Sequence, residues 1–246
     1  GTVLHLHGFF PAGWKPADKW GAIVFFFGGG WRGGTPSQFY PFCRALALRG
    51  MVAFSAEYRV KSRDGVSPAE CVADAKSAVR WIRAHAAELG VDPGRIAAGG
   101  GSAGGHIAAC AGVIPGLEDP ADRYRDVSSR PDALVLFNPV LDTEAFLGLK
   151  KVLGDTARKI SPMAHVRPGL PPAILFHGTA DTTVPFAQAK AFAKAVKEAG
   201  NRIVFVPAPG GRHGFFNYGR DKNKYFPMCV KKMEAFLKDL GFFKVQ

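Results

Sequence analysis

Apolar residues gather in short continuous runs, and these alternate with longer segments whose apolar positions recur three and four residues apart. A short continuous apolar run predicts a strand buried on both faces, as the inner strands of a parallel sheet are. A recurrence of three and four predicts a helix with one apolar face. The expected strands are 21–27, 51–56, 95–99, 133–137, 173–176 and 202–206, with an N-terminal edge strand around Val3, Leu4 and Leu6.

The clearest helix begins at Ser67-Pro68-Ala69-Glu70, which has the sequence of a capping box with proline at the first helical position. Because strands and helices alternate throughout, the predicted fold is α/β: a doubly wound, mostly parallel sheet flanked by helices on both faces. No linker, repeat or low-complexity segment interrupts the pattern, so a single domain is expected over residues 1–246. The other expected helices are 37–49, 185–199 and 227–240.

The composition is that of a globular protein, with 47% hydrophobic and 21% charged residues. The net charge of +12 would suit a nucleic-acid partner, but the basic residues are spread out and no recognition motif accompanies them, so none is expected. An anionic substrate or surface is the weaker inference that the charge allows, with denser basic stretches at 150–167 and 220–238. No apolar run approaches the ~20 residues of a membrane span.

Cysteine and histidine spacing predicts neither a metal site nor a bound cofactor. The four cysteines are far apart and share no metal-ligand spacing, so buried thiols are expected. His5 and His7 share one face of the edge strand, but no third ligand lies nearby, which favours packed or solvated histidines. The sequence specifies neither the cellular compartment nor the oligomeric state. A secreted or periplasmic location would require a signal peptide before Gly1 that has been removed.

Candidate chemistry begins at Gly100-Gly101-Ser102-Ala103-Gly104, a G-x-S-x-G match between a predicted strand and an apolar helix. A serine on such a strand–turn–helix takes a strained backbone conformation, and its hydroxyl stands clear of the sheet. Small flanking residues let the strand and the helix cross almost in contact. The alternative is a glycine-rich turn around an ordinary serine, so the interpretation as a nucleophile depends on finding a base and an acid.

His213 is the candidate base, because it alone among seven histidines lies in a glycine-rich loop after the last predicted strand. The acid should follow a strand between Ser102 and His213, which leaves Asp181 and Asp142. Asp181 is favoured because its turn is tight and leads straight into a helix. Its task would be to fix the imidazole tautomer and stabilise the imidazolium. Turn capping is the alternative role for either carboxylate.

Phe27-Gly28-Gly29-Gly30-Trp31 directly follows a predicted central strand and is the candidate oxyanion hole. Glycines let a backbone approach a ligand closely, so the amides of Gly29 and Gly30 could converge with that of Ala103 on one oxygen. A plain flexible loop is one alternative. A phosphate cradle is disfavoured because no G-K-[ST] follows. Trp31 and Phe215 are the aromatic residues expected to wall the substrate site.

These motifs together resemble an α/β-hydrolase, with Ser102, Asp181 and His213 in the order of that superfamily's triad. Segments 28–31, 101–106 and 177–181 resemble the esterases related to hormone-sensitive lipase, and are most similar to the branch of acetyl esterases and bifunctional feruloyl and acetyl-xylan esterases. The resemblance runs from about residue 20 to the C-terminus. It implies a cofactor-free serine esterase that acts through an acyl-enzyme on short-chain esters, with carbohydrate esters as expected substrates.

One position departs from that family, which usually has a histidine bracing the glycine loop where this chain has Phe27. Phe27 cannot brace the loop by hydrogen bonding through its side chain, although the amide donors remain. Relatives of hormone-sensitive lipase also usually carry a helical cap from sequence before the glycine loop. Here only 27 residues precede Gly28, and segment 142–171 is short, polar and without an amphipathic stripe. An open site with a minimal cap or none, and a small acyl pocket, is therefore expected.

Three other functions fit the same pattern. A general carboxylesterase of small-molecule esters would need the same machinery. An amide-cleaving hydrolase of this fold is disfavoured because such peptidases often carry an extra domain. A catalytically silent binding module is also possible on any hydrolase fold, but such modules usually lose the base or the nucleophile, and both Ser102 and His213 are present.

Overall fold

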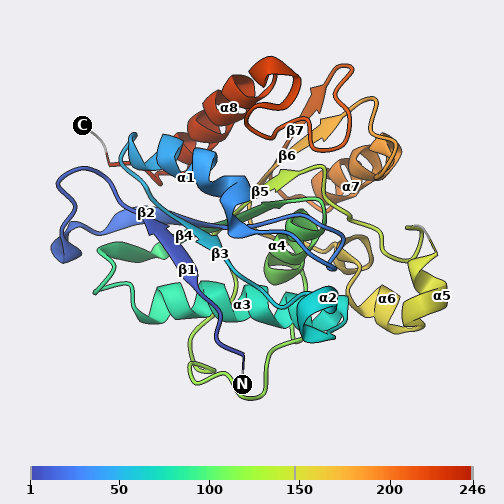
Figure 1. The fold of residues 1–246 in the computed structure, drawn as a ribbon, viewed down its shortest axis with the longest axis horizontal. Helices are drawn as coiled ribbons and strands as arrows, with labels where there is room; N and C mark the ends of the chain where they lie inside the picture. The colour runs from blue at the N-terminus through green and yellow to red at the C-terminus, as the bar shows by residue number, and fades with distance from the viewer. Residues whose placement is uncertain (1, 147, 245–246) are drawn as a thin grey trace.

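A seven-stranded sheet in the order β1-β3-β2-β4-β5-β6-β7 forms the centre of the computed structural model, which describes residues 2–146 and 148–244 (Figure 1). Neighbouring strands are parallel except β1 and β3, so the predicted doubly wound, mostly parallel sheet is confirmed. The strands are β1 (Leu6–Phe9), β2 (Trp20–Phe26), β3 (Val52–Ala56), β4 (Val91–Gly101), β5 (Ala133–Phe137), β6 (Ala173–Gly178) and β7 (Ile203–Ala208).

Helices cover both faces of the sheet, with α1 and α8 on one side and α3 and α4 on the other (Figure 1). Successive residues of β2 serve the two faces in turn: Val24 and Phe26 pack with α3 and α4, whereas Ile23 and Phe25 pack with α1 and α8. This division explains why β2 has no polar or charged residue along its length. The longer helices are α1 (Tyr40–Ala47), α3 (Pro68–Ala84), α4 (Ala103–Val113), α7 (Phe186–Glu198) and α8 (Phe226–Asp239).

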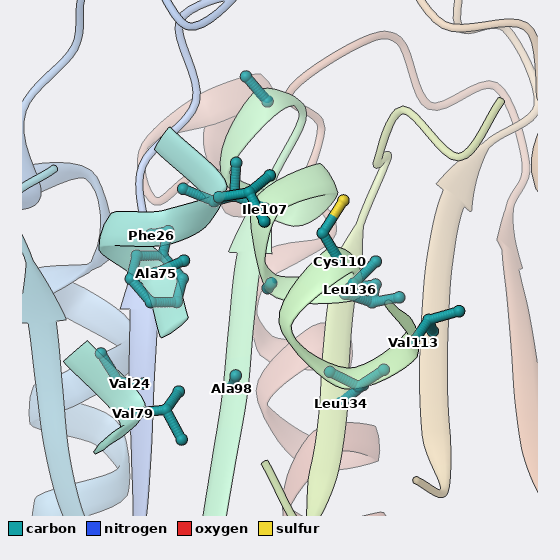
Figure 2. Close-up of a cluster of buried hydrophobic side chains, with 14 of the residues drawn as sticks. Val24, Phe26, Ala75, Val79, Ala98, Ile107, Cys110, Val113, Leu134 and Leu136 are labelled. Atoms are coloured by element: carbon teal, nitrogen blue, oxygen red, sulfur yellow. The ribbon is translucent and has the colours of Figure 1, made fainter. Parts of the chain in front are cut away.

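The helix α3 has the predicted capping box, in which the Ser67 amide donates to Glu70 Oε2 at 3.0 Å. Its buried stripe packs on the sheet and on α4, and Figure 2 shows Ala75 beside Phe26 and Val79 beside Val24 of β2. Every residue of α4 is buried, because the sheet covers one side of this helix while α3 and the segment after β5 cover the rest. The helix that follows Ser102 is therefore anchored in the core.

Short helices line the loops at the carboxyl ends of the strands. In segment 142–171, three of them follow one another. The described residues contain no helix long and apolar enough to cross a membrane and no cluster of side chains suited to a metal ion. All four cysteines are buried free thiols, as expected. The short helices are η1 (Pro16–Asp18), η2 (Pro36–Phe39), α2 (Lys61–Asp64), α5 (Leu149–Leu153), α6 (Thr156–Lys159), η3 (Pro162–His165) and η4 (Arg220–Asn223).

Candidate active site

Ser102 stands on the turn between β4 and α4 with φ 53° and ψ −118°, a conformation that L-residues rarely adopt. The positions two residues before and two residues after it must be glycine. A Cβ on Gly104 would lie 2.0 Å from the carbonyl oxygen of Phe26, and one on Gly100 would lie 2.5 Å from that of Gly104. The close packing of strand against helix thus keeps Ser102 in this conformation, which costs about 1–3 kcal/mol.

The side chains of Ser102, His213 and Asp181 form one hydrogen-bonded chain. Ser102 Oγ lies 2.9 Å from His213 Nε2, and His213 Nδ1 lies 2.7 Å from Asp181 Oδ2. A carboxylate only accepts hydrogen bonds, so Nδ1 carries the proton and Nε2 is free to accept one from the serine. The three residues follow β4, β7 and β6 at one edge of the sheet. The structure therefore brings together the three residues that the motifs nominate.

Asp181 is held as a buried carboxylate. Its Oδ1 accepts from the amides of Thr183 and Val184, both at 2.9 Å, and His177 Nε2 lies 3.4 Å from its Oδ2. Burial alone would raise the pKa of Asp181, but the hydrogen bonds from His177, His213 and the Val184 amide lower it far below its ordinary value of 3.8. Asp181 is consequently ionised throughout the neutral range and fixes the imidazole ring.

The other candidate acid, Asp142, makes different hydrogen bonds. Its Oδ1 accepts from the amides of Glu144 and Ala145, both at 3.1 Å, in the manner of an Asx turn. None of the hydrogen bonds between described residues joins it to His213. The geometry therefore favours Asp181 as the partner of the imidazole.

The glycine loop after β2 lies against the serine turn. A Cβ on Gly28 would lie 3.0 Å from the Gly101 carbonyl oxygen and 3.3 Å from Ser102 Cβ. Gly29 has φ 135°, and a Cβ there would meet the Gly33 carbonyl at 2.0 Å, so no other residue fits. Within the described ranges, the amides of Gly29 and Gly30 donate to no protein acceptor. The Ala103 amide opens α4, where an N–H has no intrahelical partner.

A cavity of about 1000 Å³ opens in front of Ser102, His213 and the glycine loop. Its charged lining consists of Arg32, Lys61 and Arg220, and no carboxylate lines it among the residues the structure describes. None of these three cations forms a salt bridge with a described residue. An apolar wall completes the cavity: Val140, Phe146, Leu149, Val152 and Leu153.

Two expectations about this cavity need correction. Trp31 lines it, but Phe215 is fully buried and does not; the next residue, Phe216, takes that place. The loop has no periodicity that could have told the two apart. The prediction that segment 142–171 presents no apolar stripe is wrong for α5, where Leu149, Val152 and Leu153 face the cavity. A five-residue helix is too short for its periodicity to stand out in the sequence.

The structure also shows how the glycine loop is braced without the usual histidine. The Tyr58 hydroxyl donates to the Phe27 carbonyl at 2.8 Å, and the two rings stack with centroids 4.2 Å apart. On the other side, the Gly28 amide donates to Gln38 Oε1 at 2.7 Å. Neither Tyr58 nor Gln38 belongs to a recognisable motif, so sequence reasoning passed over both.

The sequence and the fold of this chain match those of known esterases. A family model described as BD-FAE matches residues 12–153 and 138–196. The structure of Thermogutta terrifontis esterase 2 phosphoramylated by tabun superposes with a TM-score of 0.95; it is 52% identical and the match covers 100% of this chain and 92% of that one.

Curated relatives are more distant and longer. The probable carboxylic ester hydrolase LipM of Mycobacterium tuberculosis is 27% identical over 227 residues, which are 85% of this chain and 52% of LipM. Esterase LipQ of the same bacterium is 31% identical over 208 residues, which are 76% of this chain and 48% of LipQ. This chain thus spans about half the length of the curated relatives it matches. From the family model and the structural match together, the chain belongs to the BD-FAE family, among the hormone-sensitive-lipase-like esterases of the α/β-hydrolase superfamily.

Proposed function

We propose that this chain is a serine carboxylic-ester hydrolase that works through an acyl-enzyme. The observation that carries the proposal is the continuous hydrogen-bonded chain from Ser102 Oγ through the His213 ring to Asp181. Thermogutta terrifontis esterase 2 has been solved phosphorylated by paraoxon, a reagent class that reacts with activated serines, which adds support from a relative 52% identical to this chain.

In this mechanism Ser102 Oγ attacks the ester carbonyl carbon while its proton passes to His213 Nε2. Asp181 stabilises the imidazolium that forms. The amides of Gly29, Gly30 and Ala103 donate to the oxyanion of the tetrahedral intermediate. When the intermediate collapses, the C–O bond to the alcohol breaks and the alcohol leaves with the proton from His213. A water then repeats the sequence on the acyl-enzyme, releases the acid and restores Ser102.

The substrates proposed are short-chain acyl esters, with carbohydrate esters foremost. Thermogutta terrifontis esterase 2 has been solved with propionate and with butyrate bound, which favours a small acyl group. A Butyrivibrio fibrisolvens endo-1,4-beta-xylanase B is 29% identical over 181 residues, which are 28% of that protein, and this favours a carbohydrate setting. The alternative is a general carboxylesterase of small-molecule esters, which the cavity of about 1000 Å³ would equally admit.

The test is hydrolysis of p-nitrophenyl esters from acetyl to octanoyl, beside acetylated xylan and methyl ferulate. Each methylene that is buried adds ~0.8 kcal/mol, or about fourfold in kcat/KM, until the acyl pocket is full. We expect the maximum between acetyl and butyryl and a fall by octanoyl. Ser102→Ala should abolish turnover, whereas Ser128→Ala, at an exposed serine before β5, should not. A maximum at octanoyl would contradict the small acyl pocket, and activity in Ser102→Ala would contradict the mechanism.

A further inference from the structure

A side-chain bridge joins the glycine loop to the loop that carries His213. Gln38, in η2, accepts from the Gly28 amide at 2.7 Å and donates through Nε2 to Asn217 Oδ1 at 2.9 Å. The two bridging residues are 179 positions apart in the sequence, and both line the cavity in front of Ser102. The bridge therefore runs along the wall of the cavity and connects two loops that leave different strands.

At its far end the bridge holds the peptide next to His213. Asn217 donates to the Gly214 carbonyl twice, from Nδ2 at 2.9 Å and from its own amide at 3.1 Å. The Gly214 amide donates in turn to Asn138 Oδ1 at 3.1 Å, and Asn138 is fully buried. Both polar groups of Gly214 are thus engaged. Gly214 has a φ of +76°, a left-handed conformation that favours glycine, and these contacts hold its peptide in place next to His213.

At its near end the bridge holds the residue immediately before the oxyanion amides. Gly29 and Gly30 both have positive φ, at 135° and 63°, and successive glycines give a backbone many accessible conformations. Tyr58 fixes the Phe27 carbonyl on the core side, and Gln38 fixes the Gly28 amide on the cavity side. That bond also turns the Gly28 N–H toward Gln38, which leaves the next two amides as the donors available to substrate.

We propose that Gln38 and Asn217 are positioning residues that fix the oxyanion amides relative to His213. This rests on the proposed esterase function and adds to it. A tetrahedral intermediate needs the imidazole and the oxyanion donors in one geometry, and a misplacement of ~1 Å can lower the rate about 100-fold. Ground-state binding depends on the cavity walls and needs no such alignment. Loss of the bridge therefore lowers kcat much more than it raises KM.

The experiment is a double-mutant cycle of Gln38→Leu, Asn217→Leu and the double variant, with p-nitrophenyl butyrate as substrate and butylboronic acid as a tetrahedral probe. We expect each single change to lower kcat about 10- to 100-fold and to weaken the boronate in parallel, with KM within about threefold. Asn217→Leu should have the larger effect, because it also removes the Nδ2 hydrogen bond to the Gly214 carbonyl. The effect of the double variant should be smaller than the sum of the two single effects, because both changes break the same hydrogen bond between Gln38 and Asn217.

Gln188→Leu is the matched control. Gln188, in α7, also joins two segments through its amide: it accepts from the Leu141 amide at 2.8 Å and donates to the Asp142 carbonyl at 3.1 Å. Neither contact involves the glycine loop or His213. This variant should lose thermal stability while keeping kcat and boronate affinity.

The positioning role is overturned if both bridge variants behave like Gln188→Leu, or if their effects on kcat are fully additive. Should Gln38→Leu fail to fold, Asn217→Leu breaks the same bridge from its other end, and its kcat, KM and boronate affinity test the proposal. Labelling of wild-type Ser102 by an organophosphonate separates the two claims. A wild type that neither labels nor turns over refutes the esterase function, whereas an active wild type with unimpaired bridge variants refutes only the bridge.

Discussion

A buried histidine beside the active site should make folding depend on pH. His106 follows Ser102 by one helical turn and is fully buried in α4. Trp31 Nε1 donates to its Nδ1 at 3.2 Å, so its Nε2–H donates to the Ile160 carbonyl at 2.7 Å. Burial lowers the pKa of His106 from 6.5 to about 4, and protonation would also remove the acceptor that holds Trp31.

The sign follows from proton linkage. Below pH 6.5 the unfolded chain binds a proton at this histidine, while the folded chain does not until the pH reaches about 4. The folded state therefore loses stability as the pH falls through this window, by about 1.4 kcal/mol per pH unit and about 3 kcal/mol in all. Above pH 6.5 both states are neutral here and this contribution is constant. Asp181, whose pKa is depressed, loses its contribution only in more acidic solution, below its ordinary value of 3.8.

The assay is urea unfolding followed by tryptophan fluorescence at several pH values between 7.5 and 4, for the wild type and His106→Gln. Glutamine keeps a donor and an acceptor but does not titrate. The difference in unfolding free energy between wild type and variant should shrink by about 3 kcal/mol from pH 7 to pH 4. His85→Gln, at the C-cap of α3, retains His106 and serves as the control for replacing a histidine by glutamine. If the difference in unfolding free energy between the wild type and His106→Gln stayed constant from pH 7 to pH 4, the reasoning would be refuted.

Three further predictions concern the site and its supports. Asp181→Asn should lower kcat about 10⁴-fold, since the wrong tautomer of His213 is then favoured, while Asp142→Asn should change kcat little. If steady-state kinetics showed the larger loss of kcat for Asp142→Asn, the catalytic acid would be Asp142, in the loop after β5. Gly104→Ala should lower the unfolding free energy by about 3 kcal/mol or more, because its Cβ would lie 2.0 Å from the Phe26 carbonyl oxygen. The control is Gly33→Ala, whose Cβ would meet nothing closer than 3.9 Å and which should leave the thermal melting temperature nearly unchanged. The basic stretch 150–167 is partly neutralised, since Lys150 and Arg158 both pair with Glu144. Electrostatic steering of an anionic substrate should therefore come from the cations that line the cavity. Replacing Arg32, Lys61 and Arg220 by Gln should remove the salt dependence of kcat/KM for an anionic ester, and a salt-independent wild type would contradict this.

Local signals in the sequence predicted much of the fold. The strand predicted at 133–137 is β5 to the residue, and the capping box at Ser67 and Glu70 marks the start of α3. These elements are specified by their own residues: a continuous apolar run, or a cap followed by a stripe. The Ser102 turn was predictable for a similar reason, because only glycine fits where strand and helix cross so closely.

Contacts between distant loops were not predictable in this way. The bond between Gln38 and Asn217 joins loops whose sequences carry no periodicity, and only the folded sheet brings them together. The same reason explains the error of one residue at Phe215 and Phe216, since an irregular loop has no pattern that says which ring faces the cavity. The edge strand begins at Leu6 and not at Val3, because pairing with β3 sets its start.

The central claim is that Ser102 is the nucleophile of a serine esterase, and stoichiometric labelling tests it most directly. The wild type is titrated with a p-nitrophenyl organophosphonate, the released nitrophenol is counted, and the modified peptide is located by mass spectrometry. We predict one adduct per chain, on the peptide that contains Ser102, with ester hydrolysis lost in proportion to labelling and no adduct in Ser102→Ala. Full activity in protein whose Ser102 is modified, or inactivation by an adduct at another residue, would contradict the account.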